Sequence, residues 1–265
     1  KAGEKNAEVS LHIYDVTNSK TQKIDLSNYN DFYIARLKWT NDSNVLSAQV
    51  LNRHQDNLDL LFVDGNSGAK KVVLNEKDKA YVDVTDNLTF LKDNSFIWTS
   101  EKDGYNHIYH YDKSGKLKNQ VTKGKWEVTS YYGFDEKNKK IYYQSVENGS
   151  INRDVYSISI DGKAKKRLSL KTGTNNATFS PNFQYFINTH SSATSAPYYS
   201  LNDSKTSKEV KKIQSNEAVE EKLAKYNVAP KEFSTITTEK GHILNTWMIK
   251  PKDFDATKKY PVFMF

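Results

Sequence analysis

One structural unit recurs in four copies along this chain of 265 residues. Each copy passes from an apolar strand through a tight polar turn into an aromatic-rich strand, and then through a loop into a third strand that ends in Asp or Asn. The equivalent aromatic residues follow one another at intervals of 51, 44 and 45 positions, at Trp39, Phe90, Phe134 and Phe179. A period near 45 residues with about four strands per repeat is typical of a β-propeller blade.

The turns and strands of each copy support this interpretation. The segments TNDSN, LKDNS and SPNFQ supply Asp, Asn, Ser and Pro where a hairpin must reverse. Within the strands apolar residues alternate with polar ones, as at Ile158, Ser159 and Ile160. An isolated blade cannot bury its aromatic side chains, so we expect stacking of neighbouring blades to stabilise the fold.

The repeats divide most of the chain into predicted blades. Residues 1–27 read as a partial blade, because the stretch 11–26 has the pattern of outer strands without the inner ones. Four whole blades are expected at about residues 30–75, 78–122, 126–170 and 175–214. The predicted fold class is mainly β: a partial β-propeller of about four to five four-stranded blades within residues 1–214.

A different pattern begins after residue 214. Residues 215–230 read as one short linking helix, with Ser215 or Asn216 as its cap and Pro230 beyond its end. Acidic residues near its start and lysines near its end agree with the helix dipole.

The last part of the chain reads as the start of another domain. Residues 233–251 form a predicted hairpin that turns at EKGH. Residues 262–265 read as an apolar strand that stops in mid-course. We therefore expect residues 231–265 to be the truncated opening of a second domain, in a chain that is a fragment of a longer protein.

Composition excludes several classes of protein. There is no cysteine, which excludes disulfides, zinc–thiolate sites and cysteine nucleophiles. The longest wholly apolar run is Val262–Phe265, so no membrane span is expected in this segment. The 39 Lys and Arg outnumber the 32 Asp and Glu to give a net charge of +7, but the lysines are scattered and form no long basic run. A solvated surface is therefore favoured over nucleic-acid binding.

Five segments carry a resemblance to a known family. They are KAGEKNAEVSLHIYD (1–15), LNRHQDNLDLLFVD (51–64), SEKDGYNHIYHYD (100–112), TKGKWEV (122–128) and KKYPVFMF (258–265). In this order and spacing they resemble successive landmarks of the dipeptidyl peptidase IV family, over essentially the whole chain. The resemblance implies the second half of an eight-bladed propeller, followed by a short helix and the opening strands of an α/β-hydrolase domain.

The resemblance also implies an activity for the parent protein. Enzymes of this family are serine exopeptidases that release N-terminal dipeptides, preferably with Pro or Ala at the second position. The implied partners are therefore peptide substrates and, for the full-length protein, a second copy in a homodimer. No cofactor or metal is implied, and the implied location is secreted or periplasmic.

The catalytic residues of such an enzyme are not expected in this chain. An α/β-hydrolase carries its nucleophile in G-x-S-x-G, and no such pentapeptide occurs here. The nearest string, residues 65–69, lacks the final glycine and reads as a hairpin turn. By the resemblance, the oxyanion tyrosine would follow Phe265, and the glutamate pair that holds the substrate's amino terminus would precede Lys1. We therefore expect a catalytically inert chain.

The six histidines predict neither a catalytic triad nor a metal site. His12, His107 and His110 fall in predicted strands, and the spacing of three places the last two on opposite faces of one strand. We expect them to pack or to lie at the surface. Tyr105 and Trp126 belong to the family pattern and are expected to fix blade turns and contacts between blades.

The predicted substrate contacts lie in residues 81–87, YVDVTDN. In the family that this chain resembles, a loop at this place approaches the substrate cleft. Asp83 and Asp86 are the polar residues available there and are the candidate substrate-binding residues. The alternative is that both aspartates only form or cap the turn.

Three functions remain open at this point. The first is the propeller portion of a dipeptidyl peptidase, where the ring restricts access to slim, unfolded peptide ends. A prolyl tripeptidyl peptidase is a close alternative, and a stand-alone binding propeller without an enzyme is a third. Residues 260–265 favour the two enzymes, because a scaffold has no need of a hydrolase-like tail.

Overall fold

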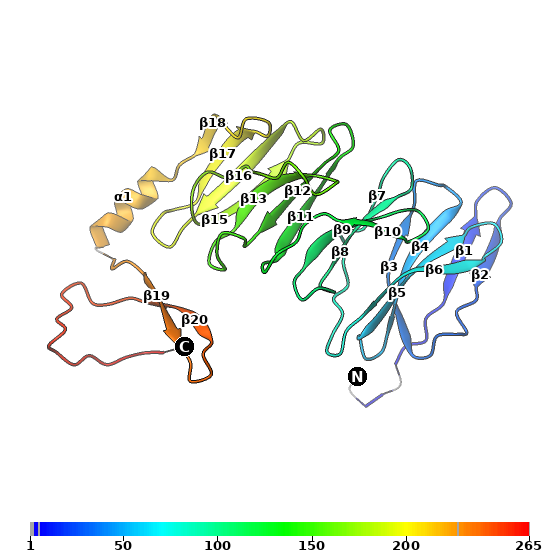
Figure 1. Cartoon of the computed structure of the whole chain (residues 1–265), viewed down its shortest axis with the longest axis horizontal. Coiled ribbons are helices and arrows are strands. Elements are labelled where there is room, and N and C mark those ends of the chain that lie inside the picture. The colour runs from blue at the N-terminus through cyan, green and yellow to red at the C-terminus, as the bar shows by residue number, and fades with distance from the viewer. Residues whose placement is uncertain (1–2, 5, 227, 265) are drawn as a thin grey trace. The chain divides into compact units, whose positions relative to one another are not determined.

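The computed structural model describes residues 3–4, 6–226 and 228–264 (Figure 1). The predicted limits at Lys1 and Phe265 therefore lie outside the described residues. Most regular structure is strand. Two short strands, β1 (Leu11–Asp15) and β2 (Lys20–Ile24), pair in antiparallel fashion ahead of the larger sheets.

Four four-stranded antiparallel sheets follow along the chain. The first contains β3 (Phe32–Trp39), β4 (Val45–Asn52), β5 (Asn57–Asp64) and β6 (Lys70–Lys77). The second contains β7 (Thr89–Phe90), β8 (Phe96–Ser100), β9 (His107–Tyr111) and β10 (Leu117–Gln120). The third contains β11 (Val128–Asp135), β12 (Lys140–Ser145), β13 (Asp154–Ser159) and β14 (Lys166–Arg167). The fourth contains β15 (Thr174–Phe179), β16 (Tyr185–Ser191), β17 (Tyr198–Asp203) and β18 (Glu209–Gln214).

Within each sheet the strands are hydrogen-bonded in chain order. Every connection inside a sheet is therefore a hairpin or a short loop, as the turn residues predict. These sheets confirm the predicted fold class, a partial propeller of four-stranded blades.

The chain divides into two compact units. The first comprises Lys1–Glu147 with Tyr156–Lys166, and the second comprises Asn148–Val155 with Arg167–Phe265. The third sheet contributes strands to both units, because β13 and β14 each cross the division.

In the first unit, successive side chains of a middle strand pack into two different hydrophobic clusters, one on each face of the sheet. Phe96 and Trp98 of β8 pack in a cluster with Leu60 of β5, whereas Ile97 packs in another cluster with Ile141 of β12. Successive side chains point to opposite faces of a strand, so a strand packed on both faces is buried throughout. Each large apolar side chain buried in this way contributes about 1.5–3 kcal/mol to folding. This packing is the predicted stacking of neighbouring blades.

The predicted helix is α1 (Glu217–Tyr226), and residue 227 is outside the described part. The backbone carbonyl of Asn216 accepts hydrogen bonds from the first turn, at Val219 N and Glu220 N. The Asn216 side-chain oxygen instead accepts from Gln214 Nε2 at 3.0 Å, and its Nδ2 donates to the carbonyl of Pro197, so its side chain is engaged outside the first turn of the helix. No helix within the described ranges has the length and apolar character needed to cross a membrane.

After the helix, β19 (Glu232–Thr237) and β20 (Ile243–Met248) form the predicted antiparallel hairpin. Its turn is closed by a hydrogen bond of 2.8 Å from Thr238 N to His242 O. Residues 262–264 are exposed and are not in a strand, so the predicted apolar strand is wrong over these three residues. An apolar run becomes a strand only where another strand pairs with it.

Candidate functional site

A cleft of about 370 Å³ in the first unit contains both predicted substrate contacts. It lies between the segment that joins β6 to β7 and the residues at the end of β8 and in the following loop. Asp83 and Asp86 line one side, and Glu101 and Asn106 line the other. A larger hollow of about 730 Å³ beside residues 6–10 and 23–32 contains none of the predicted site residues.

The segment that forms one wall of the cleft is irregular. After β6, two backbone hydrogen bonds attach it to the β4–β5 loop. They run from Asp78 N to Asp56 O at 3.0 Å and from Val82 N to Gln55 O at 2.8 Å. The exposed ring of Tyr81 adds a hydrogen bond of 2.9 Å from its hydroxyl to the same Gln55, at Oε1. These contacts bring Asp83 to the rim of the cleft.

Carboxylates gather around this cleft, which Lys77 and Lys102 also line. Burial raises the pKa of Glu101, and the negative charges of Asp83, Glu127 and Asp78 raise it further. None of these four carboxylates forms an ion pair within the described ranges. Because like charges repel, a cationic group placed beside Glu101 would favour its ionised form.

The two predicted aspartates have different surroundings. Asp86 accepts hydrogen bonds from Arg36 at both carboxylate oxygens, from Nε to Oδ1 and from Nη2 to Oδ2 at 3.2 Å. The hydrogen bonds from Arg36 lower the pKa of Asp86 and keep it ionised. The structure therefore places both aspartates at the cleft, but only Asp83 lacks a cationic partner among the described residues.

The cleft is also lined by a half-buried carboxylate that the sequence analysis missed. Glu76, at the end of β6, accepts hydrogen bonds from Trp98 Nε1 at 3.1 Å and from Ser100 Oγ at 2.7 Å. Burial raises its pKa. Beside it, Lys102 donates to the Tyr111 hydroxyl at 2.7 Å. The segment SEKDGY at residues 100–105, which contains Ser100 and Lys102, is the sequence signal for this part of the site.

Two of the histidines have the packing role that was predicted. His107 is buried, with Nδ1 3.0 Å from Thr122 Oγ1 and Nε2 3.0 Å from Gly124 O. His110, on the opposite face of β9, has Nε2 3.0 Å from Ser95 Oγ. Burial lowers the pKa of His110, which favours the neutral ring.

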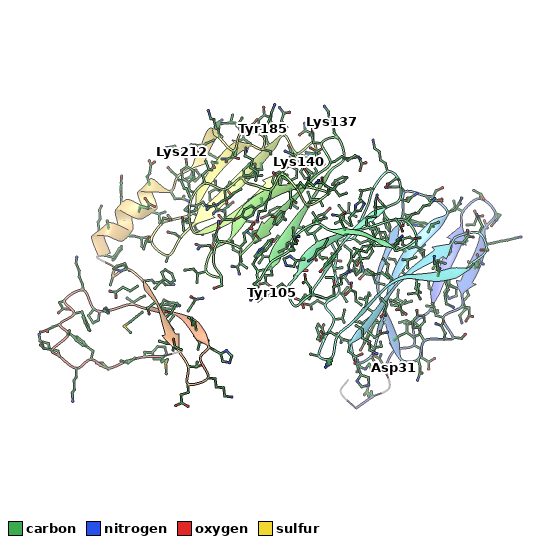
Figure 2. The ribbon with its side chains drawn as sticks, in the orientation of Figure 1. Asp31, Tyr105, Lys137, Lys140, Tyr185 and Lys212 are labelled. Carbon is green, nitrogen blue, oxygen red and sulfur yellow. The ribbon has the colours of Figure 1, made fainter. Side chains whose placement is uncertain are left out.

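The two aromatic residues of the family pattern differ in burial. Trp126 packs its ring edge against His107 with centroids 4.9 Å apart and stacks on Tyr143 at 6.4 Å. Tyr105 is 40% exposed, in the loop between β8 and β9 at the lower end of the second sheet (Figure 2). Trp126 therefore has the predicted structural role, whereas Tyr105 is partly exposed.

The string at residues 65–69 is a turn, as predicted. Ser67 donates to the Asp64 carboxylate through both its backbone N, at 2.7 Å, and its Oγ, at 2.8 Å. A hydroxyl held in this way closes a hairpin and is not presented as a nucleophile.

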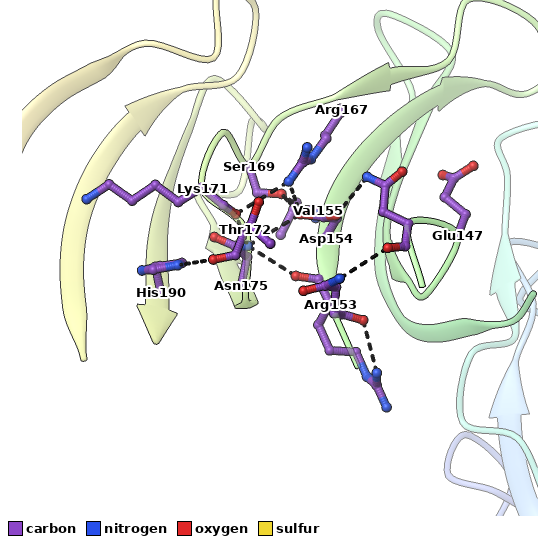
Figure 3. A network of polar contacts seen from close by, with 12 residues as sticks. Glu147, Arg153, Asp154, Val155, Arg167, Ser169, Lys171, Thr172, Asn175 and His190 are labelled. Atoms are coloured by element: carbon purple, nitrogen blue, oxygen red, sulfur yellow. Dashed lines mark hydrogen bonds and ion pairs between the residues drawn. The ribbon is translucent and has the colours of Figure 1, made fainter. Parts of the chain in front are cut away.

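A second polar cluster lies in the second unit and centres on buried Asp154 (Figure 3). Its carboxylate accepts hydrogen bonds from Arg167 Nη2 at 2.7 Å, Ser169 Oγ at 2.8 Å and Asn148 Nδ2 at 2.9 Å. These donors satisfy the buried charge, so the cluster is a structural one that fixes the loop 148–153.

Successive four-stranded antiparallel sheets with a polar cleft at their loops define a β-propeller module. Residues 1–197 match the family described as the dipeptidyl peptidase IV (DPP IV) N-terminal region, and the chain belongs to this family. The predicted resemblance is thereby confirmed.

Relatives with solved structures or known names agree. The crystal structure of Porphyromonas gingivalis dipeptidyl peptidase 4 is similar over 98% of this chain and 37% of that chain, with a TM-score of 0.92 and 41% identity. Dipeptidyl peptidase 4 of Trichophyton equinum is 30% identical over 274 residues, which cover 99% of this chain. A putative dipeptidyl aminopeptidase IV from Bacteroides ovatus, 24% identical with a TM-score of 0.82, shares the fold. The chain spans 35% of the length of the Trichophyton equinum protein.

Proposed function

We propose that this chain is the propeller portion of a serine-type dipeptidyl peptidase that releases N-terminal dipeptides with Pro or Ala at the second position. In this proposal residues 1–214 are the propeller portion, 215–230 the linking helix and 231–265 the start of the hydrolase domain. The 41% identity to a dipeptidyl peptidase 4 over nearly the whole chain supports it. The propeller supplies no catalytic group and restricts access to narrow, unfolded peptide ends.

The observation that carries the role in substrate binding is the unpaired carboxylate of Asp83 at the cleft. Asp83 lies close enough to Glu101 for its charge to raise the pKa of that carboxyl group. A cationic group of a peptide placed between them would relieve this repulsion. We assign Asp83 as a peptide contact on these grounds, and we place Asp86 in the same wall of the cleft.

The parent protein is expected to be secreted or periplasmic and to work as a homodimer without a cofactor. These expectations follow from the family and are part of the proposal. A tripeptidyl peptidase would carry the same fold, so the length of the released product separates the two activities.

The test uses the full-length protein that contains this chain. It should hydrolyse Gly-Pro and Ala-Pro chromogenic substrates, and mass spectrometry of a longer peptide with Pro at position two should show a released dipeptide. Release of tripeptides would replace the dipeptidyl assignment with a tripeptidyl one. A pure full-length protein that binds peptides and releases neither product would support a binding propeller instead.

A further inference from the structure

Beyond its backbone hydrogen bonds to the β4–β5 loop, the wall segment of the cleft is held by side chains from other strands. Gln49 of β4 donates from Nε2 to the carbonyl of Thr85 at 2.9 Å. The hydroxyl groups of Thr85 and Thr99 lie 2.8 Å apart, and Asn87 Nδ2 lies 3.1 Å from Thr99 Oγ1. The position of this irregular stretch therefore depends on these side-chain contacts.

Strand β3 and the turn that follows it add a ladder of three contacts, each of which joins residues 50 positions apart. Arg36 binds Asp86, Lys38 Nζ donates to Leu88 O at 2.6 Å, and Asn41 Nδ2 donates to Leu91 O at 2.6 Å. Arg36 and Lys38 are two residues apart in β3, so their side chains point to the same face of the strand. The ladder fastens the stretch 86–91 along the first sheet.

Arg36 makes the ion pair of this ladder, and its partner Asp86 is the contacted residue closest to Asp83 along the chain. Its guanidinium group meets the Asp86 carboxylate at two nitrogens, which fixes direction as well as distance. Both side chains are well exposed, at 49% and 70%, so the pair contributes little to the stability of the fold. We expect this ion pair instead to fix the position of the backbone around Asp86.

We infer that Arg36 is a positioning residue for the cleft: through Asp86 it holds the wall segment so that Asp83 faces Glu101. The inference rests on the proposed function, because it gives the cleft a part in substrate binding. It assigns Asp86 an indirect role, three residues away from the aspartate that meets the peptide.

The test compares Arg36→Gln with the wild type in the full-length protein. Hydrogen exchange of the amides of residues 83–88 should become faster in the variant, because a tether of the segment is lost. KM for an Ala-Pro substrate should rise about fivefold with little change in kcat, since substrate binding and not chemistry is affected. The melting temperature should stay within about 2 °C, as expected for an exposed ion pair.

Two further variants make the result specific. The exchanged pair Arg36→Glu with Asp86→Arg keeps opposite charges in place and should recover most of the lost affinity. Lys139→Gln removes an exposed ion pair with Glu136 in the β11–β12 turn and should change neither exchange at 83–88 nor KM. Figure 2 labels Lys137, in this turn, and Lys140, the first residue of β12, away from Tyr105.

The outcomes separate the inference from the proposed function. Unchanged exchange at 83–88 in Arg36→Gln would overturn the inference, whatever the activity. Faster exchange with unchanged KM would also overturn it, because the segment would then have no part in binding. A wild-type protein that releases no dipeptide would refute the proposed function, while the exchange measurement would still show whether Arg36 holds the segment.

Discussion

Gly124 and Trp126 approach so closely that a Cβ atom on Gly124 would lie 2.2 Å from Trp126 Nε1. The φ of Gly124 is +147°, a conformation that other residues rarely adopt. Its carbonyl also accepts the hydrogen bond of His107. The segment TKGKW therefore needs glycine at this place for the tryptophan to pack on the buried histidine.

Gly124→Ala should consequently destabilise the fold by about 2–4 kcal/mol, through overpacking and backbone strain. Thermal unfolding should show a melting temperature lower by about 5 °C or more. Gly104→Ala is the matched control, since Gly104 also has positive φ, +96°, but has no atom within 4 Å of the added Cβ. Equal losses in the two variants would show that strain alone is responsible and that the contact with Trp126 is not.

Asp154→Ala should lower the free energy of unfolding by about 3–5 kcal/mol, because it leaves the Arg167 charge and several donors without their acceptor. The measurement is the urea midpoint of the protein. Asp161→Ala removes an aspartate that is 56% exposed and 3.9 Å from Lys163, and it should change stability by less than about 0.5 kcal/mol. A loss at Asp154 as small as this would contradict the structural role of the cluster in Figure 3.

The raised pKa of Glu76 predicts that the stability of the fold depends on pH. Burial raises its pKa in the folded state, so the folded protein holds this proton at pH values where the unfolded chain has released it. Its contribution is therefore fully present below the unfolded pKa and is lost as the pH rises through the folded pKa. Glu76→Gln cannot ionise, so its melting temperature relative to the wild type should increase from pH 4 to pH 7. A relative melting temperature that falls over this range would show that the hydrogen bonds from Trp98 and Ser100 outweigh burial.

The repeat of aromatic residues predicted the fold because a sheet stacked between neighbours needs apolar side chains on both faces. The same repeat does not predict burial at each position. Trp39 and Phe90 are equivalent in the repeat, yet Trp39 is 49% exposed at the end of β3, while Phe90 packs on Phe62 at 5.8 Å. Burial depends on the next sheet, which one repeat does not contain.

The candidate site was predicted only in part for a related reason. The position of Asp83 and Asp86 in one loop was readable from residues 81–87. The partner of Asp86 lies 50 residues earlier in the chain, and nothing local marks Arg36 as that partner. Glu76 likewise lies next to the end of a lysine-rich strand and has the sequence context of an exposed residue, although Trp98 and Ser100 donate hydrogen bonds to its carboxylate.

Asp83→Asn, in the full-length protein, tests the proposed peptide contact with almost no change in side-chain volume. Removing the charge should lower kcat/KM for Gly-Pro and Ala-Pro substrates about tenfold, which corresponds to a loss near 1.4 kcal/mol of transition-state stabilisation. Asp161→Asn, in the exposed β13–β14 turn, is the matched control and should leave kcat/KM unchanged. If Asp83→Asn instead keeps full kcat/KM and lowers only the melting temperature, the aspartate shapes its turn and does not meet the peptide.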